Sequence, residues 1–119
     1  MPTAETLRHF ITRVEQNAHV EAIEEFYAPH ASMCENQAAP RVGRNFLVAG
    51  ERRTLALARS ATSTCLRPFS VNADHVVIGW IFHWWDGTVS DMEELAYQRR
   101  ESDHIAEQQF FYDPAQRVR

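Results

Sequence analysis

Apolar residues at helical spacing predict three helices in the first half of the chain. The first helix has apolar residues at i, i+3, i+4 and i+7, which are Leu7, Phe10, Ile11 and Val14. This spacing places them along one buried stripe, and Thr3 can serve as the N-cap. A second, shorter helix covers residues 20–27 and stops at Pro29, because proline cannot continue a helix. Residues 31–35 read as a brief strand, and residues 43–59 form the third helix.

The second half of the chain has the residue types of a β-sheet. From residue 61 onward it is rich in β-branched and aromatic residues, which favour pleated surfaces; they are Thr62, Thr64, Phe69, Val71, Val76, Val77, Ile78, Trp80, Ile81 and Phe82. Turn signals at Asn72-Ala73-Asp74, Asp86-Gly87 and Ser102-Asp103 divide this half into four strands. The pattern therefore predicts an α+β protein with its helices first and its sheet second.

The Asp86-Gly87 turn predicts which side chains share a face of the sheet. If it is a two-residue loop, Trp85 lies opposite Thr88. Counting outward from this pair assigns each side chain of the two strands to one face of the sheet. One face then has mixed polarity and carries Ile81, His83, Met92, Glu94, Ala96, Gln98, Gln109 and Phe111. The other face is apolar and carries Val76, Ile78, Trp80, Phe82, Trp84, Leu95 and Tyr97. This register predicts that Glu94 points inward and Trp80 points outward.

Length and composition narrow the range of functions. A chain of 119 residues fits a single domain, residues 1–119. The net charge is −4 and the arginines are scattered, so nucleic acid is not an expected partner. Cys34 and Cys65 are the two cysteines, too few for a disulfide framework or a structural zinc site. No stretch has the apolar length of a membrane span or the pattern of a signal peptide, so the expected location is the cytoplasm, with no membrane partner.

Four segments resemble the nuclear transport factor 2-like superfamily, and specifically its SnoaL-like polyketide cyclase and ketosteroid isomerase branch. They are Asn17-Ala18-His19, residues 25–33, the Asp86-Gly87 hairpin and residues 105–113. The resemblance implies a cone-shaped, curved antiparallel sheet, mixed at its edge, wrapped around three N-terminal helices as in cystatin-like folds. It also implies an apolar cavity inside the cone and a homodimer through the outer face of the sheet. With the predicted register, that interface would contain Trp80, Phe82, Trp84 and Tyr97.

The resemblance also carries over particular site residues. Glu35 falls where ketosteroid isomerases place their general-base carboxylate, at the end of the first short strand. The hydrogen-bonding acid of that family falls near Ala96, and its oxyanion-hole tyrosine falls near Ile11 or Thr12. None of these side chains donates in the same way, so steroid isomerisation itself is disfavoured. Limonene epoxide hydrolases share the fold, but their Asp-Arg-Asp arrangement has no counterpart on the predicted strands.

Three residues are candidates for catalysis. Glu35 is either a general base with a pKa raised by an apolar pocket or a solvated carboxylate at a loop edge. Glu94 lies mid-strand on the predicted pocket face, so it is either a catalytic or anchoring carboxylate or a buried one held by Arg52 or Arg53. His83 either transfers protons at the mouth of the cone or faces water.

Three functions remain open on the sequence alone. The first is a cofactor-independent isomerase or cyclase that uses a carboxylate to abstract a proton from a small apolar substrate. The second is a non-catalytic binding protein for such a molecule, and the third is a dimeric interaction module. The expected ligand-binding residues are Ile81, Met92, Gln98, Gln109 and Phe111. No cofactor and no metal ion are expected.

Overall fold

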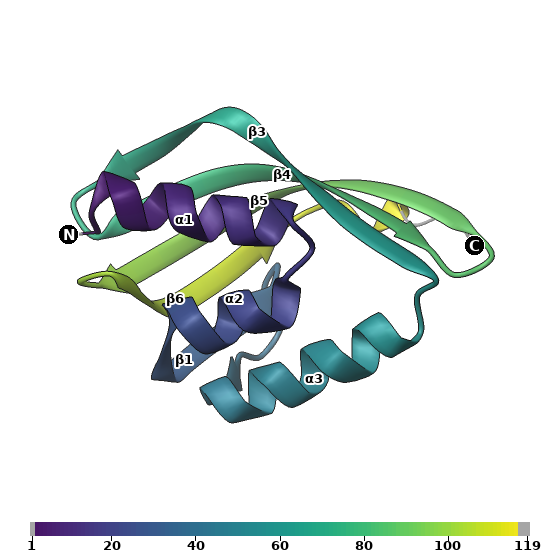
Figure 1. Cartoon of the computed structure of the whole chain (residues 1–119), viewed down its shortest axis with the longest axis horizontal. Coiled ribbons are helices and arrows are strands. Elements are labelled where there is room, and N and C mark those ends of the chain that lie inside the picture. The colour runs from purple at the N-terminus through teal and green to yellow at the C-terminus, as the bar shows by residue number, and fades with distance from the viewer. Residues whose placement is uncertain (1, 117–119) are drawn as a thin grey trace.

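The computed structural model of the protein describes residues 2–116. Within this range the helices are α1 (Ala4–Glu15), α2 (His19–Phe26) and α3 (Arg44–Ala56). The strands are β1 (Tyr27–Glu35), β2 (Arg41–Val42), β3 (Ser60–Asn72), β4 (His75–Trp85), β5 (Val89–Glu101) and β6 (His104–Phe111), followed by a short 3-10 helix, η1 (Pro114–Gln116). All the described strands join one sheet in the order β2-β1-β6-β5-β4-β3 (Figure 1).

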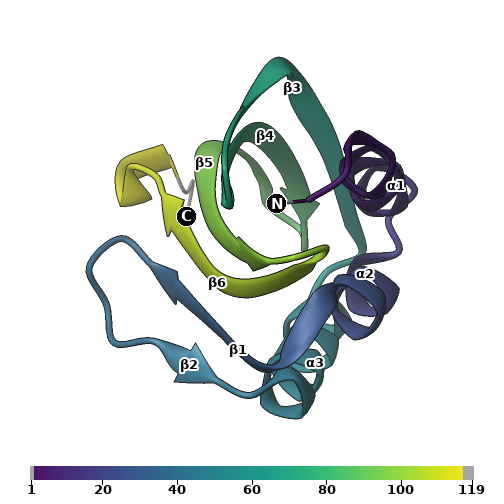
Figure 2. The ribbon, with the colours of Figure 1, turned by 90° about the vertical axis from the view of Figure 1, so that its left-hand side faces the viewer.

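The sheet is strongly curved, and the helices lie along its open side. Neighbouring strands are antiparallel except β1 and β6, which pair in parallel. Figure 2 shows the sheet curling round an interior. In this view α1 lies next to β3, and α2 and α3 lie below α1. The predicted α+β cone with a mixed sheet is therefore confirmed. None of the helices in the described part of the chain is long and apolar enough to cross a membrane.

The first helix forms as its spacing predicts, whereas the second ends earlier. Thr3 caps α1 by accepting a hydrogen bond from the Thr6 N–H at 3.1 Å, and the four predicted apolar residues of this helix are buried. The predicted second helix was too long, because Tyr27 already belongs to β1. Pro29 lies inside this strand, where the register with β6 shifts between Tyr27 and Ser32. A strand tolerates proline at such an irregularity because no ladder hydrogen bond is needed there.

The β4–β5 hairpin differs from the predicted register by one residue. Trp85 pairs with Val89, so the loop contains Asp86, Gly87 and Thr88 rather than two residues. Gly87 has φ +108°, and the Asp86 side chain accepts a hydrogen bond from the Thr88 N–H at 3.2 Å. Three-residue hairpin loops use a residue with positive φ in this way. The shift turns every side chain of β4 to the face opposite the predicted one.

The prediction that Trp80 points outward was therefore wrong. Trp80 lies opposite Glu94, so both residues share the concave face. Its side chain is 2% exposed and stacks on Phe82 with ring centroids 5.8 Å apart. Trp84, two residues beyond Phe82 on β4, is on the same face. Three of the four predicted interface residues, Trp80, Phe82 and Trp84, thus lie on the concave face, and only Tyr97 lies on the convex face.

The β5–β6 hairpin begins as predicted and then shifts. Glu101 pairs with His104 across the two-residue turn at Ser102 and Asp103, but the register changes by one between Arg99 and Arg100. A β-bulge of this kind inserts one extra residue into one strand. Beyond it Gln98 pairs with Gln108, not with Glu107 as predicted.

Candidate functional site

The predicted site residues divide between the two faces of the sheet. Glu35, Met92, Glu94 and Gln98 lie on the concave face, where their cross-strand partners include the buried Trp80 and Val76. The prediction that the other four face the cavity was wrong, because the two register shifts turn them to the convex face; they are Ile81, His83, Gln109 and Phe111. Nδ1 of His83 lies 2.9 Å from a carboxylate oxygen of Asp91 there. The four concave residues are the ones that an interior site can use.

Glu35 is tightly paired with an arginine at the end of β1. Its carboxylate accepts two hydrogen bonds from the Arg41 guanidinium, at 2.6 Å to Oε2 and 3.0 Å to Oε1. Glu35 pairs with Phe110 of β6, and the next strand along the chain, β2, supplies Arg41. This bidentate geometry fixes both groups in one plane. Glu35 is therefore held in place by Arg41, with 34% of its side chain still exposed.

A second carboxylate, which the sequence interpretation missed, approaches this pair from α3. Glu51 is half-buried and interacts electrostatically with both Arg41 and Glu35. The sequence held a signal for it, since Leu47, Glu51 and Leu55 are spaced at i, i+4 and i+8 and share one face of the helix. A glutamate in the middle of an apolar helical stripe indicates a buried charge. The structure thus brings together Glu35, Arg41 and Glu51, which we call the carboxylate cluster.

The surroundings of Glu51 favour its protonated form. Burial raises the pKa of the Glu51 carboxyl group, the charge of Arg41 opposes this, and the negative charge of Glu35 adds to it. The hydrogen bond to Glu35 raises the pKa of Arg41, so the guanidinium remains charged. A carboxyl group with a pKa raised towards neutrality can both accept and return a proton. Burial and the charge of Glu35 thus shift the Glu51 pKa upward, and the charge of Arg41 limits the shift.

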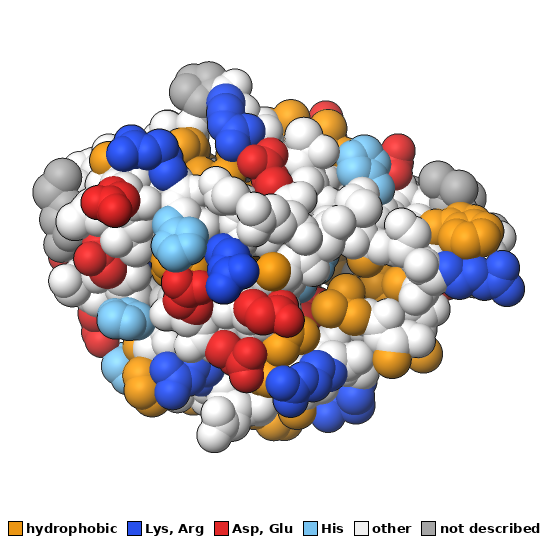
Figure 3. Space-filling view, in the orientation of Figure 1, with side chains coloured by type: hydrophobic (Ala, Val, Ile, Leu, Met, Phe, Trp, Pro, Cys, Tyr) orange, Lys and Arg blue, Asp and Glu red, His pale blue; other side chains and the backbone are white. Residues whose placement is uncertain are grey.

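Apolar side chains continue the concave face beyond the cluster. Phe110, the neighbour of Glu35, packs edge-on against Phe82 with ring centroids 6.2 Å apart, and Phe82 stacks on Trp80. Met33 and Leu47 are buried in the same core. In Figure 3 hydrophobic side chains gather around the hollow between α3 and β3. The carboxylate cluster thus lies next to apolar side chains of the concave face that belong to the core or pack against it.

A line of buried polar side chains crosses the concave face next to the cluster. Arg100 donates from Nε to Oε1 of Gln98 at 2.9 Å, and Gln98 donates from Nε2 to Oε1 of Gln108 at 2.6 Å. Gln108 in turn donates to the hydroxyl oxygen of Tyr27. Burial raises the pKa of Tyr27 above its ordinary value and lowers the pKa of Arg100 to about 10. We call these four residues the polar relay.

A histidine at the start of α2 also faces the interior. Nε2 of His19 lies 2.9 Å from Oγ of Ser63, which is buried on β3 opposite Phe82. Burial lowers the pKa of His19, so the imidazole is mainly neutral near pH 7. Within residues 2–116, no three His, Cys, Asp or Glu side chains are grouped as metal ligands would be.

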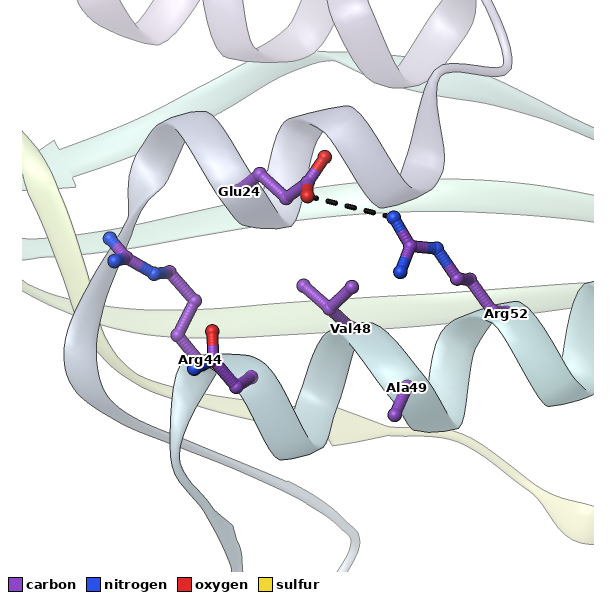
Figure 4. A pocket seen from close by; sticks show the side chains of 6 residues that line it. Glu24, Arg44, Val48, Ala49 and Arg52 are labelled. Carbon is purple, nitrogen blue, oxygen red and sulfur yellow. Dashed lines mark ion pairs between the residues drawn. The ribbon is translucent and has the colours of Figure 1, made fainter.

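Two surface hollows lie away from these residues. One, of about 310 Å³, runs between α2 and α3, where Arg52 pairs with Glu24 at 3.7 Å above Val48 and Ala49 (Figure 4). The other, of about 260 Å³, lies beside α1 and includes Arg67. Neither hollow contains a residue of the carboxylate cluster or of the polar relay. Arg52, one of the two arginines predicted to hold Glu94, pairs with Glu24.

Comparisons with known proteins identify the fold. Neither a family model nor a curated protein sequence matches this chain. A solved protein of unknown function with a cystatin-like fold, from Xanthomonas campestris, has a TM-score of 0.82 at 15% identity, covering 98% of this chain and 95% of its own. A ketosteroid isomerase-like protein from Catenulispora acidiphila, solved with trimethylamine, has a TM-score of 0.79 at 18% identity over 96% and 89%.

A candidate SnoaL-like polyketide cyclase from Mesorhizobium loti is also similar, with a TM-score of 0.77 at 18% identity, over 92% of this chain and 97% of its own. Proteins described as nuclear transport factor 2-like, from Burkholderia pseudomallei and Cytophaga hutchinsonii, match as well. At these identities the likeness concerns the fold. The chain therefore has the nuclear transport factor 2-like fold, as the resemblance implied.

Proposed function

We propose that this protein is a cofactor-independent isomerase or cyclase that moves a carbon-bound proton of a small, largely apolar carbonyl compound. The observation that carries the proposal is Glu51, a half-buried carboxyl group with a raised pKa beside the Glu35–Arg41 pair. Groups with perturbed pKa values in a concave, partly apolar setting are typical of catalytic sites. Similarity to SnoaL-like and ketosteroid isomerase-like structures supports the same class of chemistry.

Glu51 acts as the general base in this proposal. Its carboxylate takes the proton from the carbon next to the carbonyl group, and the electron pair of the broken C–H bond forms an enolate. In an isomerisation the protonated Glu51 then returns the proton to a different carbon. In a cyclisation the enolate carbon attacks an internal carbonyl group, and the protonated Glu51 gives its proton to the alkoxide oxygen that forms. Glu35 and Arg41 shift the pKa of Glu51 in opposite directions, because the negative charge of Glu35 favours protonation of Glu51 and the positive charge of Arg41 limits it. Glu94 remains an alternative base on the same face.

Hydrogen–deuterium exchange of simple ketones tests this proposal. The probes are 1-indanone and 2-tetralone in deuterated buffer, and loss of the proton signal next to the carbonyl group is followed by NMR. We expect the protein to accelerate exchange and Glu51→Gln to slow it by about 100-fold or more, the usual contribution of a general base. Glu24→Gln, on the exposed side of α2, is the matched control and should exchange at the wild-type rate.

The outcomes separate catalysis from simple binding. If either ketone binds, as seen by chemical-shift changes, but neither exchanges faster than in buffer, the non-catalytic binding alternative replaces the enzyme proposal. If exchange persists in Glu51→Gln and disappears in Glu94→Gln, the base has been assigned to the wrong carboxylate. Glu35→Gln should weaken exchange less than Glu51→Gln, because Glu35 acts through its charge.

We also propose that two copies of the chain associate through the convex face of the sheet. Leu66, Leu95 and Tyr97 expose 38%, 52% and 43% of their surface there. Gly79 lies between two of them, and a Cβ at this position would come within 3.3 Å of Leu66 and 3.7 Å of Leu95. The absence of a side chain lets Leu66 and Leu95 close over the strand and form one apolar surface. Contiguous exposed apolar patches mark association sites.

A further inference from the structure

The hollow beside α1 is lined by two segments that are far apart in the sequence. The helix contributes Arg8, Ile11 and Thr12, which are spaced at i, i+3 and i+4 and therefore share one face. The strand β3 contributes Arg67 and Phe69. Figures 1 and 2 show α1 lying along β3. The hollow, of about 260 Å³, thus lies between the first helix and an edge strand of the sheet.

An irregularity of β3 shapes one wall of this hollow. The register of β3 with β4 shifts between Leu66 and Ser70, where three residues of β3 stand opposite one residue of β4. Such a bulge interrupts the ladder and changes the direction of side chains on the longer strand. Arg67 and Phe69, two residues apart, both reach the hollow from this segment. The bulge therefore gives the hollow one basic and one apolar side chain.

Arg8 brings an unpaired positive charge to the hollow. The arginines that form ion pairs within residues 2–116 are Arg13, Arg41, Arg52, Arg67 and Arg99. Arg8 is not among them, and no side chain in the described part of the chain accepts a hydrogen bond from it. A guanidinium group stays charged in proteins and can only donate hydrogen bonds. Arg8 is therefore free to pair with an anion that enters the hollow.

Arg67 is paired but keeps donors that the pairing does not use. It donates to Glu15 from Nη2 at 2.9 Å and from Nη1 at 3.3 Å, and Nη1 also donates to the backbone oxygen of Cys65 at 3.3 Å. A guanidinium group has five N–H donors, so the Nε–H group and one N–H group of Nη2 remain. The Glu15 carboxylate also accepts from the Cys65 N–H at 3.0 Å. Two positive charges against one negative charge leave this region net positive.

Apolar side chains line the hollow together with the two arginines. Ile11 is 2% exposed and belongs to the core, and the half-buried Phe69 packs against the same core. An apolar cavity of about 150 Å³ is large enough to hold benzene, whereas pockets for drug-sized molecules begin at about 300 Å³. The size of the hollow, about 260 Å³, therefore suits a molecule with a single ring.

We propose that this hollow binds a small aromatic carboxylate, with the carboxylate group on Arg8 and Arg67 and the ring against Phe69. Guanidinium groups match the geometry of carboxylates and form paired hydrogen bonds with them. The ring removes apolar surface of the hollow from water, which favours binding. The inference is independent of the proposed function, because the hollow shares no residue with the carboxylate cluster.

Fluorine NMR with 4-fluorobenzoate as the probe tests this inference. We expect saturable binding to the wild-type protein, and we expect Arg8→Gln to weaken it by about 10-fold, as for loss of a hydrogen bond between charged groups. The probe 4-fluorobenzamide has a similar shape without the charge and should also bind about 10-fold more weakly than 4-fluorobenzoate. Arg53→Gln, at an exposed arginine in the last turn of α3, is the matched control and should bind 4-fluorobenzoate as the wild-type protein does.

A second variant fills the hollow without changing its charge. Thr12 is exposed on α1 and lines the hollow, so a phenylalanine at this position takes the space of the ring. We expect Thr12→Phe, with its fold checked by circular dichroism, to weaken binding of 4-fluorobenzoate by about 10-fold or more. Thr12→Val has nearly the volume of the original side chain and should retain the affinity of the wild-type protein within about threefold.

Backbone amide chemical shifts locate the bound probe independently of the variants. Binding in the hollow should move the amide signals of residues 8–12 and 67–69. If the signals move around Glu51 and Trp80 instead, the probe binds on the concave face and the inference is overturned, whereas the proposed function is unaffected.

Three other results would also overturn the inference. They are the absence of saturable binding by the folded wild-type protein, unchanged affinity in Arg8→Gln, and equal affinity for 4-fluorobenzoate and 4-fluorobenzamide. Acetate binding as tightly as 4-fluorobenzoate would show that the hollow takes anions without using Phe69, which contradicts the assignment of an aromatic ligand.

Discussion

Replacement of Trp80 by alanine tests the one-residue shift of β4 on which the interior depends. Trp80 is 2% exposed and packs on Phe82. A tryptophan side chain buries about 150–250 Å², and truncation of such a residue to alanine costs about 3–5 kcal/mol. With a urea dependence of about 2 kcal/mol per molar, the unfolding midpoint should fall by roughly 2 M. A domain of this size has a stability of about 5–15 kcal/mol, so the loss should be easily measured.

Trp85 provides the matched control because it lies on the same strand but on the convex face. It is 40% exposed, and its main partner is the Arg59 guanidinium, 5.1 Å from the ring centroid. Trp85→Ala should lower stability by only about 0.5–1 kcal/mol, typical of an exposed cation–π contact. Urea unfolding of both variants, followed by circular dichroism, gives the comparison. A small loss for Trp80→Ala together with a large loss for Trp85→Ala would refute the observed register and restore the two-residue turn.

Further consequences can be measured on the same protein. Glu51 binds its proton more tightly in the folded than in the unfolded chain. The free energy of unfolding should therefore fall as pH rises from the ordinary carboxyl pKa near 4.5 through the raised pKa of the folded protein. Glu51→Gln should flatten this part of the stability profile, and an unchanged profile would contradict the raised pKa of Glu51. Leu95→Arg should convert a dimer into a monomer in sedimentation velocity, whereas Leu57→Arg, at a residue 73% exposed on the C-cap of α3, should not. Thr3→Ala should cost about 1 kcal/mol in thermal unfolding because the N–H of Thr6 loses its acceptor, and a cost near zero means that the cap is dispensable.

The fold could be predicted from the sequence because its signals are local. The helical stripe of α1 and the turns that separate β3, β4, β5 and β6 depend on neighbouring residues, and all of them form. The register of β4 could not be predicted in the same way. This strand is apolar on both faces, with Val76 and Ile78 inside and Val77 and Ile81 outside, so alternation gives no signal. An Asp-Gly pair occurs in hairpin loops of two or of three residues. The length of the loop decides which side chains of β4 point to the concave face.

The candidate site was only partly predictable for a related reason. Glu35 was found through the resemblance. Glu94 was placed on the inner face by a hairpin register that was wrong by one residue, and it lies there opposite Trp80 instead of Gly79. Gln98 lies on the inner face as predicted. Arg100 is also buried in that strand, where it donates to Gln98. Glu51 had a detectable pattern within α3, but only tertiary packing brings it to Glu35. Side chains that meet through long-range contacts leave little trace in local spacing.

The parallel pairing of β1 with β6 has a consequence for folding during synthesis on the ribosome. Glu35 meets Phe110 across these strands, so β1 finds its partner only after about 75 further residues have left the ribosome. At translation speeds of about 5–20 residues per second, this delay lasts roughly 4–15 seconds. During that time the nascent strand, with Ala31 and Met33 still uncovered, offers an open edge to other chains. Co-translational protection by a chaperone should therefore matter most for this protein between the emergence of its first strand and that of its last.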